Sequence, residues 1–228
     1  MNFDVIIPIR SKSKGLKDKN IMNFTNDDHL TNHLLKKIIN IKKINKIYVI
    51  TDSNYYKHRI LKNSKIYTSF NRPKKHSADN SKINDLIDYF LKKEIDISNN
   101  ILLMQVTSPL LSKNEIVKTL KFIEKSKYQS LMHVCKSFES PYEMIKNKGK
   151  NWKYLMKKKI LNRQNYKYQF YFITGSLYYF SKKFFKKNKS TYDHSSYAYE
   201  IDKINFVDID DRLSFEIEKK LYKLKKRN

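Results

Sequence analysis

Apolar residues occur along the chain in two patterns, short continuous runs and longer stretches in which they are spaced three or four residues apart. Continuous runs of this length are typical of strands that are buried on both faces of a sheet. They predict strands at residues 3–9, 47–50, 66–68, 101–106, 130–134, 170–180 and 204–209. The spaced stretches predict amphipathic helices at residues 30–39, 55–61, 83–91, 116–123 and 213–224. Because strands and helices alternate, the pattern predicts an α/β fold with a mostly parallel sheet covered on both faces.

Residues 141–168 interrupt this alternation. The segment is polar and aromatic, and its apolar positions follow neither the helical nor the strand period. We interpret it as a small subdomain or an oligomerisation arm that is inserted into a single domain of residues 1–228.

The composition excludes several classes of protein. Hydrophobic residues make up 40% of the 228 residues, which is enough for a folded core and excludes a disordered chain. No apolar run approaches the roughly 18–20 residues needed to cross a bilayer. The single cysteine, Cys135, excludes a disulfide framework and is typical of a reducing compartment. We therefore expect a cytoplasmic protein with no membrane partner.

The chain is strongly basic, with 48 Lys and Arg against 22 Asp and Glu and a formal net charge of +26. This excess is spread from Lys12 to Arg227. Its densest stretches, 157–159 and 223–227, lack the regular aromatic residues of a base-stacking surface. The charge therefore favours a solvated, Lys-rich surface over a nucleic-acid partner, with affinity for polyanions as the alternative.

The loop of residues 10–20 follows the first predicted strand and carries Arg10, Lys14, Gly15 and Lys19. Parallel sheets bind ligands at the carboxyl ends of their strands, where a loop offers backbone N–H groups and cations to phosphates. The loop matches neither Gly-x-x-x-x-Gly-Lys-Ser/Thr nor Gly-x-Gly-x-x-Gly, so it has neither of these two fingerprints. Taken alone, these residues are compatible with a phosphate-binding loop and with an ordinary Lys-rich surface loop.

Asp208 and Asp210 are two residues apart in the last predicted strand, which places them on the same side of it. Two close carboxylates repel each other unless a cation neutralises them, and Mg²⁺ prefers oxygen ligands together with substrate phosphates. The alternative is a solvated strand end at which Asp210 or Asp211 caps the final helix.

Other polar residues give weaker indications. His29 and His33 are one helical turn apart, but no third metal ligand is near them, so we expect capping or surface roles. His133 lies in an apolar run and is expected in the core. Arg163, beside Gln164, is a candidate for binding a carboxylate.

Several short motifs follow one another in the order found in a known family. They are Arg10-x-x-Ser13-Lys14-Gly15-x-x-x-Lys19-Asn20, Asn71-Arg72-Pro73 with Ala78-Asp79, Leu103-Met104-Gln105-Val106-Thr107-Ser108-Pro109-Leu110, Arg163-Gln164, Gly175 with Tyr178, and Val207-Asp208-Ile209-Asp210. From about residue 3 to residue 224 the chain resembles the acylneuraminate cytidylyltransferases, also called CMP-sialic acid synthetases.

The resemblance implies a nucleotidyltransferase that joins CMP from CTP to an acidic nine-carbon 2-keto sugar and releases pyrophosphate. It implies a three-layer α/β/α, Rossmann-like nucleotide-binding domain and a homodimer formed through an arm at about residues 141–168. It also implies Mg²⁺ as the cofactor, with Mn²⁺ as an alternative.

The resemblance further assigns the site residues. For the nucleotide they are Arg10, Lys14, Gly15, Lys19, Asn20, Arg72, Asp79 and Ser81. For the sugar they are Gln105, Thr107, Ser108, Arg163, Gln164, Thr174 and Gly175. The catalytic set is Arg10, Lys19, Asp208 and Asp210, of which the two aspartates bind the metal.

Some positions differ from the pattern of the family. Thr174 stands where an Asn is expected before Gly175, and the Pro141-Tyr142-Glu143 region differs from the sialic acid enzymes. The sugar therefore stays open, with pseudaminate, legionaminate and 3-deoxy-octulosonate as alternatives. An alternative from another class is a non-catalytic basic protein that binds polyanions.

Overall fold

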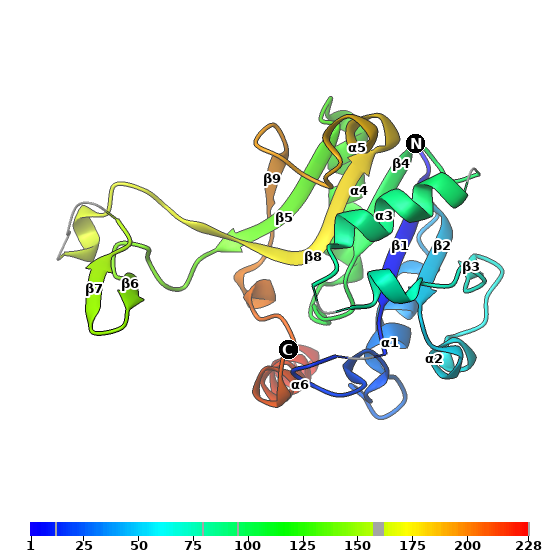
Figure 1. Ribbon diagram of the computed structural model, residues 1–228, viewed down its shortest axis with the longest axis horizontal. Helices are drawn as coiled ribbons and strands as arrows, with labels where there is room; N and C mark the ends of the chain where they lie inside the picture. The colour runs from blue at the N-terminus through cyan, green and yellow to red at the C-terminus, as the bar shows by residue number, and fades with distance from the viewer. Residues whose placement is uncertain (12, 79, 95, 157–161, 228) are drawn as a thin grey trace.

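A seven-stranded, mostly parallel sheet forms the centre of the computed structural model, which describes residues 1–11, 13–78, 80–94, 96–156 and 162–227 (Figure 1). The strands are Phe3–Ile9 (β1), Ile44–Thr51 (β2), Ile66–Tyr67 (β3), Asn100–Met104 (β4), Ser130–Lys136 (β5), Tyr171–Ser181 (β8) and Tyr197–Glu200 (β9). Their order in the sheet is β3-β2-β1-β4-β8-β5-β9. Only β8 runs antiparallel to its neighbours, β4 and β5, among these strands. The predicted α/β class is confirmed.

Helices cover both faces of the sheet. They are Leu30–Ile38 (α1), Asn54–Arg59 (α2), Ile83–Lys93 (α3), Lys113–Lys125 (α4), Lys182–Asn188 (α5) and Arg212–Arg227 (α6). Short 3₁₀ turns lie at Lys19–Ile21 (η1), Lys74–His76 (η2), Arg163–Asn165 (η3) and Lys203–Phe206 (η4). The five predicted helices are all present, whereas α5 was not predicted.

Two apolar cores separate the three layers. Val5 and Ile7 of β1 pack into the core that contains residues of α1, α2, α4 and α6. Ile6, which points to the other face because side chains alternate along a strand, packs with residues of α3 and α5. The double coverage explains why β1 is buried at six of its seven positions.

Local capping interactions fix where two helices begin. Ser112 and Glu115 form a capping box at the start of α4, each side chain accepting from the other residue's backbone N–H. His29 caps α1 by accepting from Asn32 N, which confirms the capping role expected for it.

His133 is fully buried beneath α4, as expected for a core residue. Its two ring nitrogens form hydrogen bonds with the hydroxyl groups of Thr119 and Ser176.

The predicted last strand at residues 204–209 is wrong. Asp202 accepts from Ile204 N, and this turn starts η4 in place of a strand. Within the described chain, residues 207–210 belong to no strand, although the backbone of Val207 is extended. The actual last strand, β9, lies just before them and pairs with β5 in parallel. Its Tyr-Ala-Tyr-Glu sequence is too short and polar to be seen as an apolar run.

The described residues of the segment 141–168 form a projection rather than a part of the central sheet. The strands Ile145–Lys148 (β6) and Asn151–Tyr154 (β7) pair as an antiparallel hairpin at the end of two long connections from β5 and β8 (Figure 1). We call the described residues of this segment the arm. Whether the arm dimerises stays a prediction. Among the described residues, no helix has the length and apolar character to span a membrane.

Candidate active site

A cavity of about 200 Å³ opens beyond the carboxyl ends of β1 and β4. The predicted site residues that line it are Arg10, Lys19, Asn20, Arg72, Gln105, Thr107, Asp208 and Asp210. They come from four separate segments of the sequence. The structure thus brings together most of the residues assigned to the nucleotide and the metal, at the edge where parallel sheets bind ligands.

The loop after β1 is held down by polar contacts at both of its ends. Ser11 donates to Asp52 through its backbone N–H (2.9 Å) and its hydroxyl (3.2 Å). Asn20 is buried and donates to Arg10 O (2.8 Å), and Asn20 O accepts from Thr31 (2.6 Å). These bonds place Arg10 and Lys19 at the cavity.

Lys19 connects this loop to the segment before α6. Its ammonium group donates to Ile209 O (2.7 Å) and lies 3.1 Å from Asp210 Oδ1. The side chain of Lys19 is only 16% exposed, whereas that of Asp210 is 80% exposed.

Gly15 comes even closer to the same segment. A Cβ on Gly15 would lie 2.2 Å from Asp210 O, a distance that no side chain could have without moving the backbone. The position therefore requires glycine for this close approach of two backbones.

Polar atoms without partners gather in this cavity. Among the described residues, the buried atoms Ser13 Oγ, Thr107 Oγ1 and Asp208 Oδ1 have no hydrogen-bond partner. Buried polar groups in native proteins are nearly always satisfied, so such a cluster indicates a site that a polar ligand completes. Ser13 was not assigned a role from the sequence, although it lies inside the first motif.

Asp208 and Asp210 suit a hard divalent cation. Burial raises the pKa of Asp208, the charge of Asp210 adds to this effect, and the charge of Lys19 opposes it. A cation between the carboxylates would remove their repulsion. The described residues contain no group of three or more His, Cys, Asp or Glu that could hold a metal alone. The pair therefore fits Mg²⁺, which commonly binds one or two carboxylates and takes its other oxygens from phosphates and water.

The other residues assigned to the nucleotide differ in whether they line the cavity. Burial lowers the pKa of Arg72, whose guanidinium donates to His76 O from Nε (2.9 Å) and Nη2 (2.7 Å). Ser81 donates to His76 O and Ala78 O, outside the residues that line the described cavity. Lys14 is exposed, and Asp79 lies outside the described residues.

Among the sugar assignments, Gln105 and Thr107 line the cavity. Gly175 has φ of 72° at a bulge where β8 loses register with β5, and a Cβ there would lie 3.4 Å from Gln105 Oε1. The buried Ser108 hydroxyl has no partner in the described chain. Thr174 lies in the core, 2.8 Å from Ser176 Oγ, and is not among the described lining residues.

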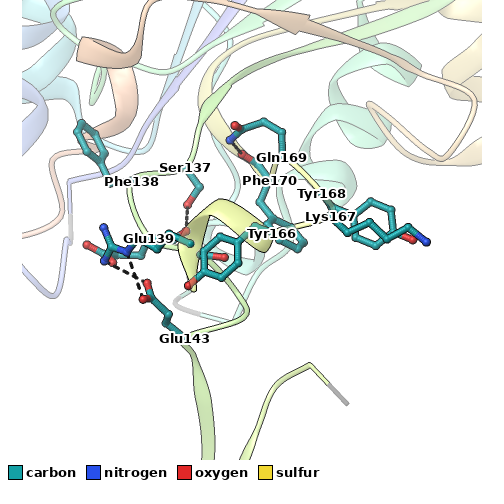
Figure 2. Close-up of a pocket in the computed structure, with 11 residues that line it drawn as sticks. Ser137, Phe138, Glu139, Glu143, Tyr166, Lys167, Tyr168, Gln169 and Phe170 are labelled. Carbon is teal, nitrogen blue, oxygen red and sulfur yellow. Dashed lines mark hydrogen bonds and ion pairs between the residues drawn. The ribbon is translucent and has the colours of Figure 1, made fainter. Parts of the chain in front are cut away.

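Arg163 and Gln164 lie elsewhere, in the arm. Arg163 lines a separate cavity of about 390 Å³ at the base of the arm, together with aromatic residues such as Tyr166 and Phe170 (Figure 2). Its Nε and Nη2 donate to the two oxygens of Glu143, each at 3.2 Å. Within the described part of one chain, the structure does not bring Arg163 or Gln164 to the cavity that holds Asp208.

Comparisons with known proteins match nearly the whole chain. A sequence model of the cytidylyltransferase family matches residues 5–226. The N-acylneuraminate cytidylyltransferase of Streptococcus agalactiae serotype III (strain NEM316) is 27% identical over 214 residues, which are 92% of this chain and 51% of that protein. The N-acylneuraminate cytidylyltransferase of Escherichia coli O18:K1:H7 (strain RS218 / NMEC) is 26% identical, over 93% of this chain and 50% of that protein. The chain spans about half the length of these relatives.

Solved structures support the fold. A CMP:2-keto-3-deoxy-manno-octonic acid synthetase complexed with CTP superposes with a TM-score of 0.69 at 11% identity, covering 99% of this chain and 100% of the other. The 4-diphosphocytidyl-2C-methyl-D-erythritol synthase of Anaerococcus prevotii gives a TM-score of 0.65 at 12% identity, covering 97% and 96%.

Proposed function

This chain belongs to the cytidylyltransferase family, and from that premise we propose that it transfers CMP from CTP to an acidic nine-carbon 2-keto sugar. The single observation that carries the proposal is the cavity in which Arg10 and Lys19 face a carboxylate pair and unpartnered polar atoms. Cations suit a triphosphate, and the carboxylates suit the Mg²⁺ that accompanies it. Relatives named N-acylneuraminate cytidylyltransferase support the sugar class.

In this proposal, the anomeric oxygen of the sugar bonds to the α-phosphorus while the bond to the bridging oxygen of the β-phosphate breaks. Pyrophosphate leaves, and the hydroxyl proton passes to solvent. Arg10 and Lys19 hold the triphosphate and offset the charge that develops on the leaving group. Asp208 and Asp210 hold Mg²⁺, which supplies further charge neutralisation at the phosphates. Catalysis then depends mainly on position and charge.

The sugar side of the proposal involves the arm. Gln105 and Thr107 contact the sugar from the cavity, and Arg163 binds its carboxylate through two parallel hydrogen bonds. Because Arg163 lies in another cavity of the same chain, this contact requires the arm of a second copy. The exposed apolar side chains of the arm, including Ile145 and Trp152, support pairing of two copies.

Pyrophosphate release tests the proposal directly. The chain is incubated with Mg²⁺ and CTP, UTP, ATP or GTP, each with N-acetylneuraminate, pseudaminate, legionaminate or 3-deoxy-octulosonate. We expect release with CTP and at least one nine-carbon acid sugar, and none when the sugar is omitted. The proposal would be contradicted by release that does not depend on any of the sugars, by release with the eight-carbon 3-deoxy-octulosonate alone, or by no release with any sugar.

A further inference from the structure

The turn that follows β4, residues 105–111, carries Gln105 and Thr107 into the cavity, and it is held from behind by basic side chains. Lys37 of α1 donates to Leu111 O (2.9 Å) and to Pro109 O. Lys225 of α6 donates to Leu110 O (3.4 Å). Three consecutive carbonyls of the turn therefore accept hydrogen bonds from two lysines.

Lys37 differs from most lysines that bind backbone carbonyls, because its ammonium group is largely removed from water. Burial lowers the pKa of Lys37 to about 7, the charge of Lys225 adds to this effect, and Glu218 opposes it. An exposed lysine at the same position would hold the carbonyls only weakly, since water competes for both groups. The burial makes each of its hydrogen bonds costly to break.

Glu218 of α6 is a buried acidic residue that interacts electrostatically with Lys37. It is fully buried, and neither of its oxygens has a hydrogen-bond partner among the described residues. Burial and the charge of Asp208 raise its pKa to about 8, while Lys37 and Lys225 oppose this shift. A buried carboxyl without partners costs stability, which argues against a purely structural reason for a glutamate that interacts electrostatically with both Lys37 and Asp208.

The held turn is also bonded to the segment that carries the carboxylates. Ile209 N donates to Thr107 O (3.0 Å), so a shift of the turn moves the backbone between Asp208 and Asp210. The route from Lys37 to the cavity thus consists of direct hydrogen bonds and one short piece of backbone.

We infer that Lys37 is a positioning residue for the proposed transfer, which fixes the 105–111 turn so that Gln105 and Thr107 face the sugar and Ile209 stays in register. The inference rests on the proposed function. We expect the larger effect on the sugar side of the site, because the turn carries Gln105 and Thr107 directly. The nucleotide side has other supports, since Lys19 donates to Ile209 O and the loop of residues 10–20 has contacts of its own.

Three variants test this role. Lys37→Met keeps the length of the side chain and removes its donors, Lys37→Arg restores donors, and Lys36→Met is the matched control on the exposed side of α1. We expect Lys37→Met to lower kcat/KM for the sugar by about tenfold or more, with the dissociation constant of CTP changed less than about twofold. Lys37→Arg should recover part of the loss, and Lys36→Met should resemble the unmodified chain.

Hydrogen exchange gives a readout without turnover. The amide of Ile209 should exchange faster in Lys37→Met than in Lys36→Met, because its acceptor, Thr107 O, is no longer fixed. If Lys37→Met does not fold, Lys225→Met carries the test, with an expected loss of about threefold in kcat/KM for the sugar.

The possible failures are distinguishable. Absence of turnover in the unmodified chain contradicts the proposed function, whatever the variants do. With active unmodified protein, the inference is overturned by equal losses for CTP and sugar, by an Arg variant no better than the Met variant, or by unchanged kinetics and exchange in a folded variant.

Discussion

Lys19 and Asp210, 191 residues apart in the sequence, form an ion pair of 3.1 Å across the candidate active site. The pair joins the cationic loop after β1 to the carboxylate segment before α6. In the proposed function, the two partners have different ligands, since Lys19 binds phosphate and Asp210 binds Mg²⁺. Binding of Mg²⁺-CTP would therefore exchange this ion pair for contacts with the ligand.

The first prediction concerns Asp210. Asp210→Asn keeps the size of the side chain but removes a charge that the metal requires, so turnover should fall by about a hundredfold or more. The matched control is Asp211→Ala. Asp211 accepts from Ser214 N (2.8 Å) at the start of α6, so this variant should lower the melting temperature and keep turnover. Near-normal turnover of Asp210→Asn at sub-millimolar Mg²⁺ would refute the metal assignment.

Lys19→Ala is the second test, because Lys19 is assigned to charge that develops on the departing pyrophosphate. The variant should lose kcat as well as kcat/KM for CTP, by about tenfold or more, even at saturating CTP. Lys17→Ala, an exposed lysine in the same loop, serves as the control and should keep both values. A variant that only raised the KM for CTP would place Lys19 in ground-state binding.

The third prediction uses the close approach at Gly15. Gly15→Ala forces the loop and Asp210 O apart, so we expect a loss of turnover that is larger than the loss of stability. In Gly149→Ala, an added Cβ has nothing within 4 Å, but φ of 64° strains the new residue, at a cost of about 1–2 kcal/mol. That variant should unfold more easily and keep its turnover. The opposite result, an active Gly15→Ala, would show that the approach is not needed.

Arg163 gives the fourth prediction. Arg163→Ala should lower kcat/KM for the sugar by about tenfold or more and leave CTP binding nearly unchanged, because a guanidinium that binds a carboxylate in two places is not replaceable. Arg163→Lys should recover little. Lys167→Ala is the control, since Lys167 lines the same arm cavity. Equal losses of kcat/KM for CTP and sugar, or a monomeric variant in light scattering, would instead show that Arg163 stabilises the arm through its hydrogen bonds to Glu143.

The fifth prediction is a pH dependence of stability. The pKa of Glu218 is raised from 4.5 to about 8 in the folded chain, so between these values the folded state holds a proton that the unfolded state has lost. Stability from this group is therefore present below pH 4.5 and lost as pH rises through about 8. Relative to Glu218→Gln, the unmodified chain should lose up to about 1.4 kcal/mol per pH unit across this window. Urea unfolding of both at several pH values measures it, and parallel curves would contradict it.

The pattern of the sequence predicted most of the fold because buried parallel strands such as β1 and β4 are nearly continuous apolar runs. It was wrong at residues 204–209, where four of the six residues are apolar but a turn at Asp202 prevents pairing. Asp208 and Asp210 were expected to share one side of a strand. They line one cavity although no strand is there. Ile209, the residue between the two aspartates, is held on both sides, because its carbonyl accepts from Lys19 and its N–H donates to Thr107 O.

The candidate site shows where a pattern ceases to be informative. Arg10 and Lys19 could be placed together because one loop carries both. The role of Gly15 depends on its distance from Asp210 O, a contact between distant segments that no local pattern contains. Likewise, the burial of Glu218 depends on which side of α6 packs on the core. Leu213 and Leu224, the residues that marked the helix, are 69% and 57% exposed instead.

The central place of β8 has a consequence for how the chain acquires its fold. The sheet half β3-β2-β1-β4 is complete once residue 104 has been made, and its strands pair in parallel. β5 follows β4 in the chain, yet β8 lies between them, so β5 gains its antiparallel partner only after residues 171–181 arrive. During synthesis, β5 and the arm are therefore made before β8, so at that stage β5 is unpaired and one edge of β4 is open. The elements β9 and α6 are made after β8. The second half of the sheet therefore closes only after most of the chain has been made, which leaves unpaired strand edges exposed until then.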